Sequence, residues 1–188
     1  MHLFGKHVNE PIWRPRRLLP HARVPVRAAH WLFDQTSLTR RVTQACAGRF
    51  RVQVLSQGWQ RPMLNEALRL GVSFDHLALV REVYLYCDAT PWVFARTIIP
   101  RTTLSGPQRH LAYLGDKPLG AVLFADPSMR RDEVEVACIR RGQLLFERAA
   151  SGGTPDAIWG RRSVFYLGGK PLLVCEIFLP PLLEAAKG

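Results

Sequence analysis

The sequence contains none of the common patterns that bind a metal ion or a nucleotide cofactor. Its four cysteines, Cys46, Cys87, Cys138 and Cys175, are far apart, form no Cys-x-x-Cys, and have no histidine close enough to indicate a zinc site. No Gly-x-Gly-x-x-Gly or P-loop sequence is present. We therefore predict no metal and no cofactor. Cys87 and Cys175 lie in apolar strand patterns, and we expect them to be reduced core thiols of a cytoplasmic protein.

Long apolar runs are absent as well. No run is long enough to cross a bilayer, and charges and prolines interrupt every apolar stretch before Ala28, which leaves no signal-peptide pattern. Acidic residues are scarce: 26 Lys and Arg stand against 15 Asp and Glu, which gives a formal charge of +11. Such an excess attracts nucleic acid, anionic lipid or a small dianion. No RNA-binding signature occurs, so we expect no nucleic-acid partner, while weak docking to an acidic membrane surface or partner stays open. We also expect a monomer.

A change in composition near residue 27 predicts the domain organisation. Residues 1–27 are basic and rich in proline, which rules out a long helix and indicates an extended N-terminal arm. Residues 28–188 are long enough for one core and predict a single domain. Helical patterns cover 28–35, Leu38–Ala47 after an N-cap at Ser37, and parts of 104–124, whereas 141–157 is typical of a long flexible loop.

Six segments of the domain have the composition and alternation of β-strands. Most are joined by short turns, and Asp88–Pro91 and Gly168–Lys170 indicate two hairpins. Strands joined in this way favour an α+β fold with an antiparallel sheet over alternating βαβ units. The six predicted strands are Phe50–Leu55, Leu79–Cys87, Trp92–Pro100, Asp132–Arg140, Trp159–Leu167 and Pro171–Leu179.

Glu176 is the only charged residue between Pro171 and Leu183. A segment this apolar predicts a strand that is buried on both faces. An ionised carboxylate there loses its hydration, which is costly unless a partner or a proton compensates it. Two interpretations are open. Glu176 forms a structural salt bridge, or it stands in a dry pocket that handles a proton-bearing substrate.

Alternation along the first predicted hairpin places two arginines among apolar residues. Arg81 shares a face with Val83, and Arg96 shares one with the aromatic residues of its own strand. A buried guanidinium keeps its charge and needs an anion. Glu176 cannot neutralise both, so the surplus predicts a carboxylate ligand held by a bidentate fork. If the strand ends differ, Arg96 is solvated instead, and Gly160–Arg162 is either a solvated strand end or a basic segment that draws in an anion.

Several short motifs follow one another in a recognisable order over residues 31–180. They are Trp31–Arg40, Arg81–Glu82, Pro91–Trp92 with Ala95–Thr97, Thr103–Pro107, Leu114–Gly115 with Pro118–Gly120, Trp159–Ser163, and Gly169–Leu173 with Glu176–Pro180. Each is short, but the ordered set is specific. In these motifs the chain resembles the chorismate pyruvate-lyase family, which makes 4-hydroxybenzoate for ubiquinone.

The resemblance implies a six-stranded antiparallel sheet with helical flaps that close over a buried site. It implies that Arg81 and Glu176 are the catalytic and substrate-binding polar groups, with further contacts at Leu38 and, through its backbone, at Leu119. The implied reaction removes the enolpyruvyl group of chorismate as pyruvate and aromatises the ring without a cofactor. We expect Arg81 to bind a carboxylate and Glu176 to bond the ring hydroxyl, and whether Glu176 also takes a proton stays open. The arginine pattern adds Arg96 as a residue that supports the site from behind.

One alternative comes from the fold class itself. Similar folds serve as small-molecule sensor domains, so a non-catalytic module that binds an aromatic carboxylate remains a second hypothesis. The sequence has no DNA-binding pattern, because its N-terminal arm is too rich in proline to supply the necessary helices. This favours the lyase over the sensor.

Overall fold

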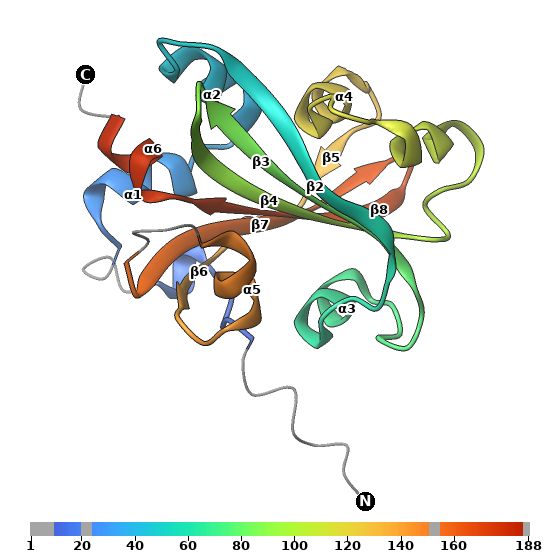
Figure 1. Ribbon diagram of the computed structural model, residues 1–188. Helices are drawn as coiled ribbons and strands as arrows, with labels where there is room; N and C mark the ends of the chain where they lie inside the picture. Colours follow the sequence, from blue (N-terminus) through green and yellow to red (C-terminus); the bar gives the residue numbers. More distant parts are fainter. Residues whose placement is uncertain (1–9, 20–23, 151–154, 186–188) are drawn as a thin grey trace, which may run out of the picture.

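A computed structural model describes residues 10–19, 24–150 and 155–185 and shows an α+β fold built on one antiparallel sheet (Figure 1). The strands are β1 (Arg14–Pro15), β2 (Phe50–Gln60), β3 (Ala78–Cys87), β4 (Thr90–Pro100), β5 (Arg130–Arg131), β6 (Glu135–Arg140), β7 (Ala157–Leu167) and β8 (Lys170–Phe178). The helices are α1 (Val26–Leu32), α2 (Leu38–Ala45), α3 (Leu64–Leu70), α4 (Leu119–Ala125), α5 (Leu144–Ala149) and α6 (Pro180–Ala185), with the 3-10 helices η1 (Arg16–Leu18) and η3 (Gly106–Tyr113).

The strand order confirms the predicted antiparallel sheet. It runs β1-β6-β7-β8-β4-β3-β2, with β5 paired to β7, and each of these pairings is antiparallel. The six longer strands correspond to the six predicted ones. Strands β1 and β5 have two residues each, which is too short for alternation to reveal them. The β7–β8 turn uses the positive φ angles of Gly168 and Gly169 (55° and 79°), a conformation that glycine adopts without steric cost.

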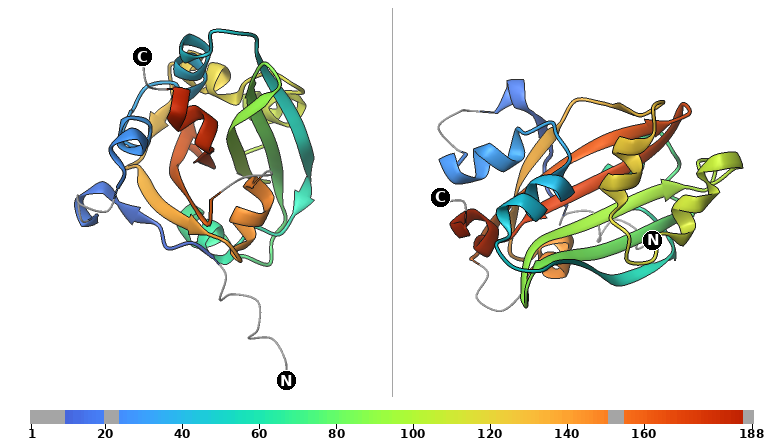
Figure 2. Two further views of the ribbon diagram at one scale, coloured as in Figure 1. Left: turned by 60° about the vertical axis from the view of Figure 1, so that its left-hand side comes forward. Right: turned by 90° about the horizontal axis from the view of Figure 1, so that it is seen from above.

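Each face of the sheet has its own core, because successive side chains of a strand point to opposite faces. Helices α2 and α4 cover one face, whereas α3 and α5 lie against the other (Figures 1 and 2). Helices α1 and α6 close one end of the molecule, where Trp31 and Leu182 pack with Phe178 of β8. The sheet therefore separates two layers of helices, and a side chain on β3, β4, β7 or β8 belongs to one layer or the other.

The segment 141–157 is not simply the flexible loop that its sequence predicts. It contains helix α5, whose Leu145, Phe146 and Ala149 are buried against the sheet. A helix of six residues is too short to produce a clear helical period, which explains why the pattern was missed. Residues 151–154 of the segment lie outside the described part of the chain.

The predicted N-terminal arm is described only over residues 10–19 and 24–27. Within it, Arg14 and Pro15 form β1 and pair with β6, and the Glu10 carboxylate accepts hydrogen bonds from the backbone N–H groups of Leu64 and Asn65, each at 2.9 Å. The division at residue 27 stays a prediction. None of the helices in the described ranges is long and apolar enough to cross a bilayer.

Cys87 is not the reduced thiol that its strand pattern predicts. It forms a disulfide with Cys46, at a Cα–Cα distance of 5.6 Å. The pairing of Phe50 with Cys87 brings the end of α2 beside the β3–β4 turn. The two cysteines are 41 residues apart in sequence, so only the strand register brings them together. Cys175 is a buried free thiol, as expected, and burial raises its pKa above the ordinary value.

Replacing both Cys46 and Cys87 by Ala should lower the free energy of unfolding by about 4 kcal/mol, because a cross-link over this length removes chain entropy from the unfolded state. Urea unfolding monitored by tryptophan fluorescence measures the loss. A thiol titration of denatured, unreduced protein should detect only the two free cysteines, Cys138 and Cys175, and all four after reduction. Four reactive thiols before reduction would contradict the disulfide.

Candidate functional site

A pocket lies between the sheet and the layer formed by α2 and α4. Its floor comes from alternate residues of neighbouring strands, namely Val83, Ala95, Thr97 and Val174 together with Glu176. It contains about 590 Å³ of space, part of which is open to solvent. Most of the lining is apolar. The charged residues among those that line it are Arg81, Arg131, Arg161 and Glu176.

Arg81 lies in the pocket as the alternation of β3 predicts, and its side chain is incompletely satisfied. It is 2 % exposed. Its Nη2 donates to the backbone carbonyls of Gly115 and Lys117, at 2.9 and 3.2 Å, whereas its Nε has no hydrogen-bond partner among residues 10–19, 24–150 and 155–185. Burial lowers the pKa of Arg81, and the opposing influence of Asp116 is smaller. Among the described residues no carboxylate forms an ion pair with it, so a buried cation is left open to an anionic ligand.

Glu176 forms a buried ion pair, as the first interpretation of its sequence predicts, and it also lines the pocket. Its Oε2 accepts a hydrogen bond of 2.5 Å from Nε of Arg161, and the same carboxylate lines the pocket. Arg161 is 1 % exposed and also donates through Nη1 to the backbone carbonyls of Trp31 and Asp34. The segment Gly160–Arg162 is therefore not a solvated strand end. Arg161 instead holds Glu176 in place at the floor of the pocket.

Arg131 is a pocket residue that the sequence did not reveal. It belongs to β5, and its Nε donates to Oγ of Ser163 at 3.0 Å while its Nη1 donates to the backbone carbonyl of Gln35 at 3.3 Å. Burial lowers its pKa, which Glu176 opposes and Arg161 reinforces. A two-residue strand carries no periodicity, so no sequence signal could have placed Arg131 in the pocket.

The helical flaps meet above the pocket. Leu38 begins α2 and Leu119 begins α4, and both are buried lining residues, at 5 % and 7 % exposed. Ser37 caps α2 as predicted, because its side chain accepts a hydrogen bond from the N–H of Arg40. A Cβ atom on Gly120 would stand 2.8 Å from Oγ1 of Thr39, so the absence of a side chain allows the two flaps to touch.

Arg96 is buried, but it lies on the opposite face of the sheet and is not one of the pocket's lining residues. Its Nε and Nη2 donate to the two oxygens of Glu66, at 2.8 and 3.1 Å, and its Nη1 donates to Glu82 at 2.7 Å. Burial alone would lower its pKa, but Glu66 and Glu82 outweigh that effect and raise it. The expected charge surplus at Arg96 was wrong, because alternation did not identify these two carboxylates as buried partners.

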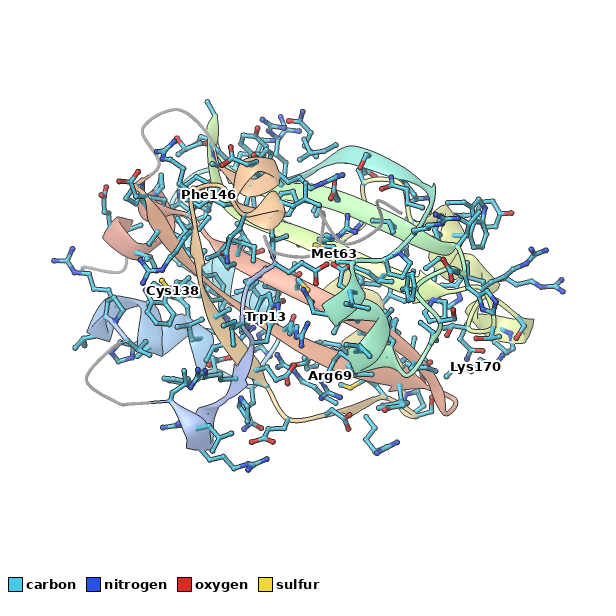
Figure 3. All side chains as sticks on the ribbon, turned by 90° about the horizontal axis from the view of Figure 1, so that it is seen from below. Trp13, Met63, Arg69, Cys138, Phe146 and Lys170 are labelled. Carbon is cyan, nitrogen blue, oxygen red and sulfur yellow. A yellow bond between two sulfur atoms is a disulfide. The ribbon has the colours of Figure 1, made fainter. Side chains whose placement is uncertain are left out.

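The ionic cluster around Arg96 extends over the same face of the sheet. Arg148 of α5 also donates to Glu82, and Arg162 donates to Glu135 and Asn65. Figure 3 looks onto this face, with Met63 and Arg69 labelled at α3 and Phe146 on α5. The buried arginines on this face of the sheet are thus paired with carboxylates. The arginines that line the pocket on the other face outnumber the carboxylate that lines it. Among the described residues, no group of three or more His, Cys, Asp and Glu side chains could hold a metal ion.

The chain is similar to one known family and to several of its curated relatives. The family model described as chorismate lyase matches residues 8–187. A probable chorismate pyruvate-lyase of Aromatoleum aromaticum is 44% identical over 88% of this chain and 91% of its own length. Those of Methylococcus capsulatus and Pseudomonas fluorescens (enzyme 2) are 42% and 39% identical, over 82% and 97% of this chain and 95% and 96% of their own lengths.

Solved structures with a similar fold come from transcriptional regulators. The C-terminal domain of the histidine utilization repressor from Pseudomonas syringae has a TM-score of 0.53 at 12% identity, and covers 71% of this chain and 93% of its own. The ligand-binding domain of a putative GntR-family regulator from Bordetella bronchiseptica has a TM-score of 0.51 at 16% identity, over 70% and 86%. At such identities the likeness concerns the fold alone.

Replacing Arg96 by Met should destabilise the protein by about 3–5 kcal/mol, because Glu66 then remains buried without its cation. Urea unfolding measures the change. Arg140→Met is the matched control, since the exposed Arg140 side chain ends β6 and its loss should cost less than about 0.5 kcal/mol. Equal stability of the two variants would show that the buried cluster contributes nothing.

Gly120→Ala should separate the flaps, since the added methyl group overlaps Thr39. We expect faster amide hydrogen exchange in both α2 and α4. A second substitution, Thr39→Ala, removes the overlapping oxygen and should restore slow exchange. Gly58→Ala serves as the control, because a Cβ there meets no atom within 4 Å. Unchanged exchange in Gly120→Ala would mean that the flaps do not depend on this contact.

Proposed function

The chain belongs to the chorismate lyase family, and we propose that it converts chorismate into 4-hydroxybenzoate and pyruvate. Chorismate is a dianion with a ring carboxylate, a ring hydroxyl and an enolpyruvyl ether on the carbon next to the hydroxyl. The C–O bond between ring and ether breaks, and the hydrogen on the hydroxyl-bearing carbon leaves. When that hydrogen moves to the methylene carbon of the enolpyruvyl group, pyruvate forms directly and the ring becomes aromatic. Atoms and electrons balance without an oxidant or a reductant.

Buried, unpaired Arg81 is the observation that carries this assignment. A guanidinium that is 2 % exposed and has a free Nε needs an anion to offset the loss of hydration. A carboxylate accepts strong charge-assisted hydrogen bonds from an arginine, and Nε is the donor of Arg81 that lacks a partner among the described residues. We assign the ring carboxylate of chorismate to Arg81. The carbonyls of Gly115 and Lys117 hold the guanidinium in place through Nη2.

Glu176 is assigned to the ring hydroxyl. Its carboxylate is an acceptor, and Arg161 holds it toward the pocket. In this role Glu176 orients the ring, so that the hydrogen and the methylene carbon face each other inside the substrate. Such a transfer depends on positioning and on exclusion of water. Leu38 and Leu119, at the starts of the two flaps, supply the apolar cover.

The non-catalytic binding module receives no comparable support. Relatives at 39–44% identity over most of the chain carry the lyase name, whereas the regulator domains share only the fold. We further propose that the enzyme acts as a cytoplasmic monomer and that its 4-hydroxybenzoate enters ubiquinone synthesis. The net charge of +11 is compatible with weak docking to an acidic membrane surface.

Incubation of the purified protein with chorismate should release pyruvate and 4-hydroxybenzoate in equal amounts, detected by a coupled pyruvate assay and by chromatography. Chorismate binding without either product would support the sensor module instead. Absence of both binding and turnover would contradict both functions.

Arg81→Ala and Glu176→Gln should each lower kcat/KM by at least about tenfold, because each removes a charge-assisted hydrogen bond to the substrate. Both variants should stay folded in thermal denaturation. Arg109→Ala, at an exposed arginine outside the pocket, should retain full activity. If both variants are largely unfolded, and the fraction of each that remains folded has wild-type kcat/KM, then the two residues have a structural role only.

A further inference from the structure

Two of the three arginines that line the pocket lack an ionic partner. Arg161 is paired with Glu176, whereas Arg81 and Arg131 form no ion pair with the described residues. With one carboxylate against three guanidinium groups, the lining carries a surplus of two positive charges. A dianionic ligand would neutralise it. The surplus is divided between two separate residues and therefore favours a ligand with two separate carboxylates.

Two acidic residues close to Arg131 in the sequence or the fold, Asp34 and Asp132, have other cationic partners. Asp34 forms an ion pair of 3.1 Å with Arg41, and its Oδ1 accepts hydrogen bonds from Thr36. Asp132, the next residue in sequence, is 3.5 Å from Arg69. Neither carboxylate is within ion-pair distance of Arg131. Its Nη2 makes no hydrogen bond with the described residues and is free for a ligand.

The sheet register separates the two unpaired arginines. Arg81 is on β3, next to β4, whereas Arg131 reaches the pocket from β5, which pairs with β7. Glu176 lies between them on β8, between β4 and β7. Arg131 is close enough to Glu176 for the two charges to influence each other. The guanidinium of Arg81 therefore lies at the end of the pocket near β3. The guanidinium of Arg131 lies at the other end, near β7 and on the far side of Glu176.

We propose that Arg131 binds the carboxylate of the enolpyruvyl group of chorismate. This inference rests on the proposed function. In chorismate the enolpyruvyl ether is attached next to the hydroxyl-bearing carbon, and the ring carboxylate is on the far side of the ring. With the ring carboxylate on Arg81 and the hydroxyl on Glu176, the second carboxylate falls at the end of the pocket that contains Arg131.

This assignment gives Arg131 a role in distinguishing substrate from product. Chorismate engages both arginines, but 4-hydroxybenzoate has only the ring carboxylate and leaves Arg131 without a partner. Arg131 therefore strengthens the binding of chorismate without strengthening that of 4-hydroxybenzoate, whereas pyruvate keeps the carboxylate that Arg131 binds. A second anchor also limits rotation of the enolpyruvyl group, which helps to hold its methylene carbon near the hydrogen that it receives.

The test compares two stable aromatic ligands, 4-hydroxybenzoate and 3-carboxymethoxy-4-hydroxybenzoate, which differ by a carboxylate in the enolpyruvyl position. Calorimetry with the wild-type protein should show that the dicarboxylate binds about ten to a hundred times more tightly, as expected for a charge-assisted pair. Arg131→Gln should remove this preference and leave the affinity for 4-hydroxybenzoate unchanged. It should also lower kcat/KM for chorismate by a similar factor, and Arg131→Lys should restore part of it.

Arg130→Gln is the matched control. It removes the same charge from the adjacent residue, which is exposed, stacks on Tyr166 and does not line the pocket. It should preserve the preference for the dicarboxylate. Equal binding of the two ligands by wild-type protein would overturn the proposal, whatever the folding of the variants. The proposal would also be overturned if folded Arg131→Gln lost affinity for both ligands by the same factor. If chorismate is not turned over but the preference exists, the proposed function fails and the second carboxylate site stands.

Discussion

The ion pair between Arg161 and Glu176 is the interaction on which the pocket depends. It joins neighbouring residues of β7 and β8, and the same guanidinium donates to the carbonyls of Trp31 in α1 and of Asp34 in the segment between α1 and α2. Burial of such a pair is costly, and the additional hydrogen bonds help to offset that cost. One buried arginine therefore fixes both the carboxylate of the floor and the chain segment that leads into a flap.

The two faces of the sheet differ in whether their buried arginines are paired with carboxylates. On the face covered by α3 and α5, Arg96 is surrounded by Glu66 and Glu82, and the cluster is complete within the protein. On the other face, Arg81 and Arg131 donate to neutral groups and form no ion pair within the part of the chain that the structure describes. Regulators with the same fold provide no information on this difference, because the fold is independent of the charges placed on it. The chain belongs to the chorismate lyase family, and the proposed binding mode places the two carboxylates of chorismate on these two arginines.

The sequence was most informative where strands are long. Alternation in β3 correctly placed Arg81 inside, and the lone charge between Pro171 and Leu183 directed attention to Glu176, which lines the pocket. The same reasoning failed for Arg96, because the acids that neutralise it, Glu66 on α3 and Glu82 on β3, become its neighbours only through tertiary packing.

Elements with few residues or distant partners could not be predicted from local patterns. Helix α5 and strand β5 are too short to show a period, so Arg131 had no signal at all. The disulfide of Cys46 with Cys87 depends on the register of β2 against β3, and cysteine spacing does not encode that register. The helical flaps over the pocket, by contrast, were predicted from the motifs of the family resemblance. Composition and periodicity alone did not predict them.

The disulfide also limits how the pocket can open. Cys46 follows the last residue of α2 and is covalently fixed to the end of β3, whereas Leu38 begins the helix and borders the pocket. One end of this helix is anchored while the other is held by non-covalent contacts alone. The disulfide therefore restricts any movement of α2 at its Cys46 end, whereas no covalent cross-link restricts the Leu38 end that borders the pocket.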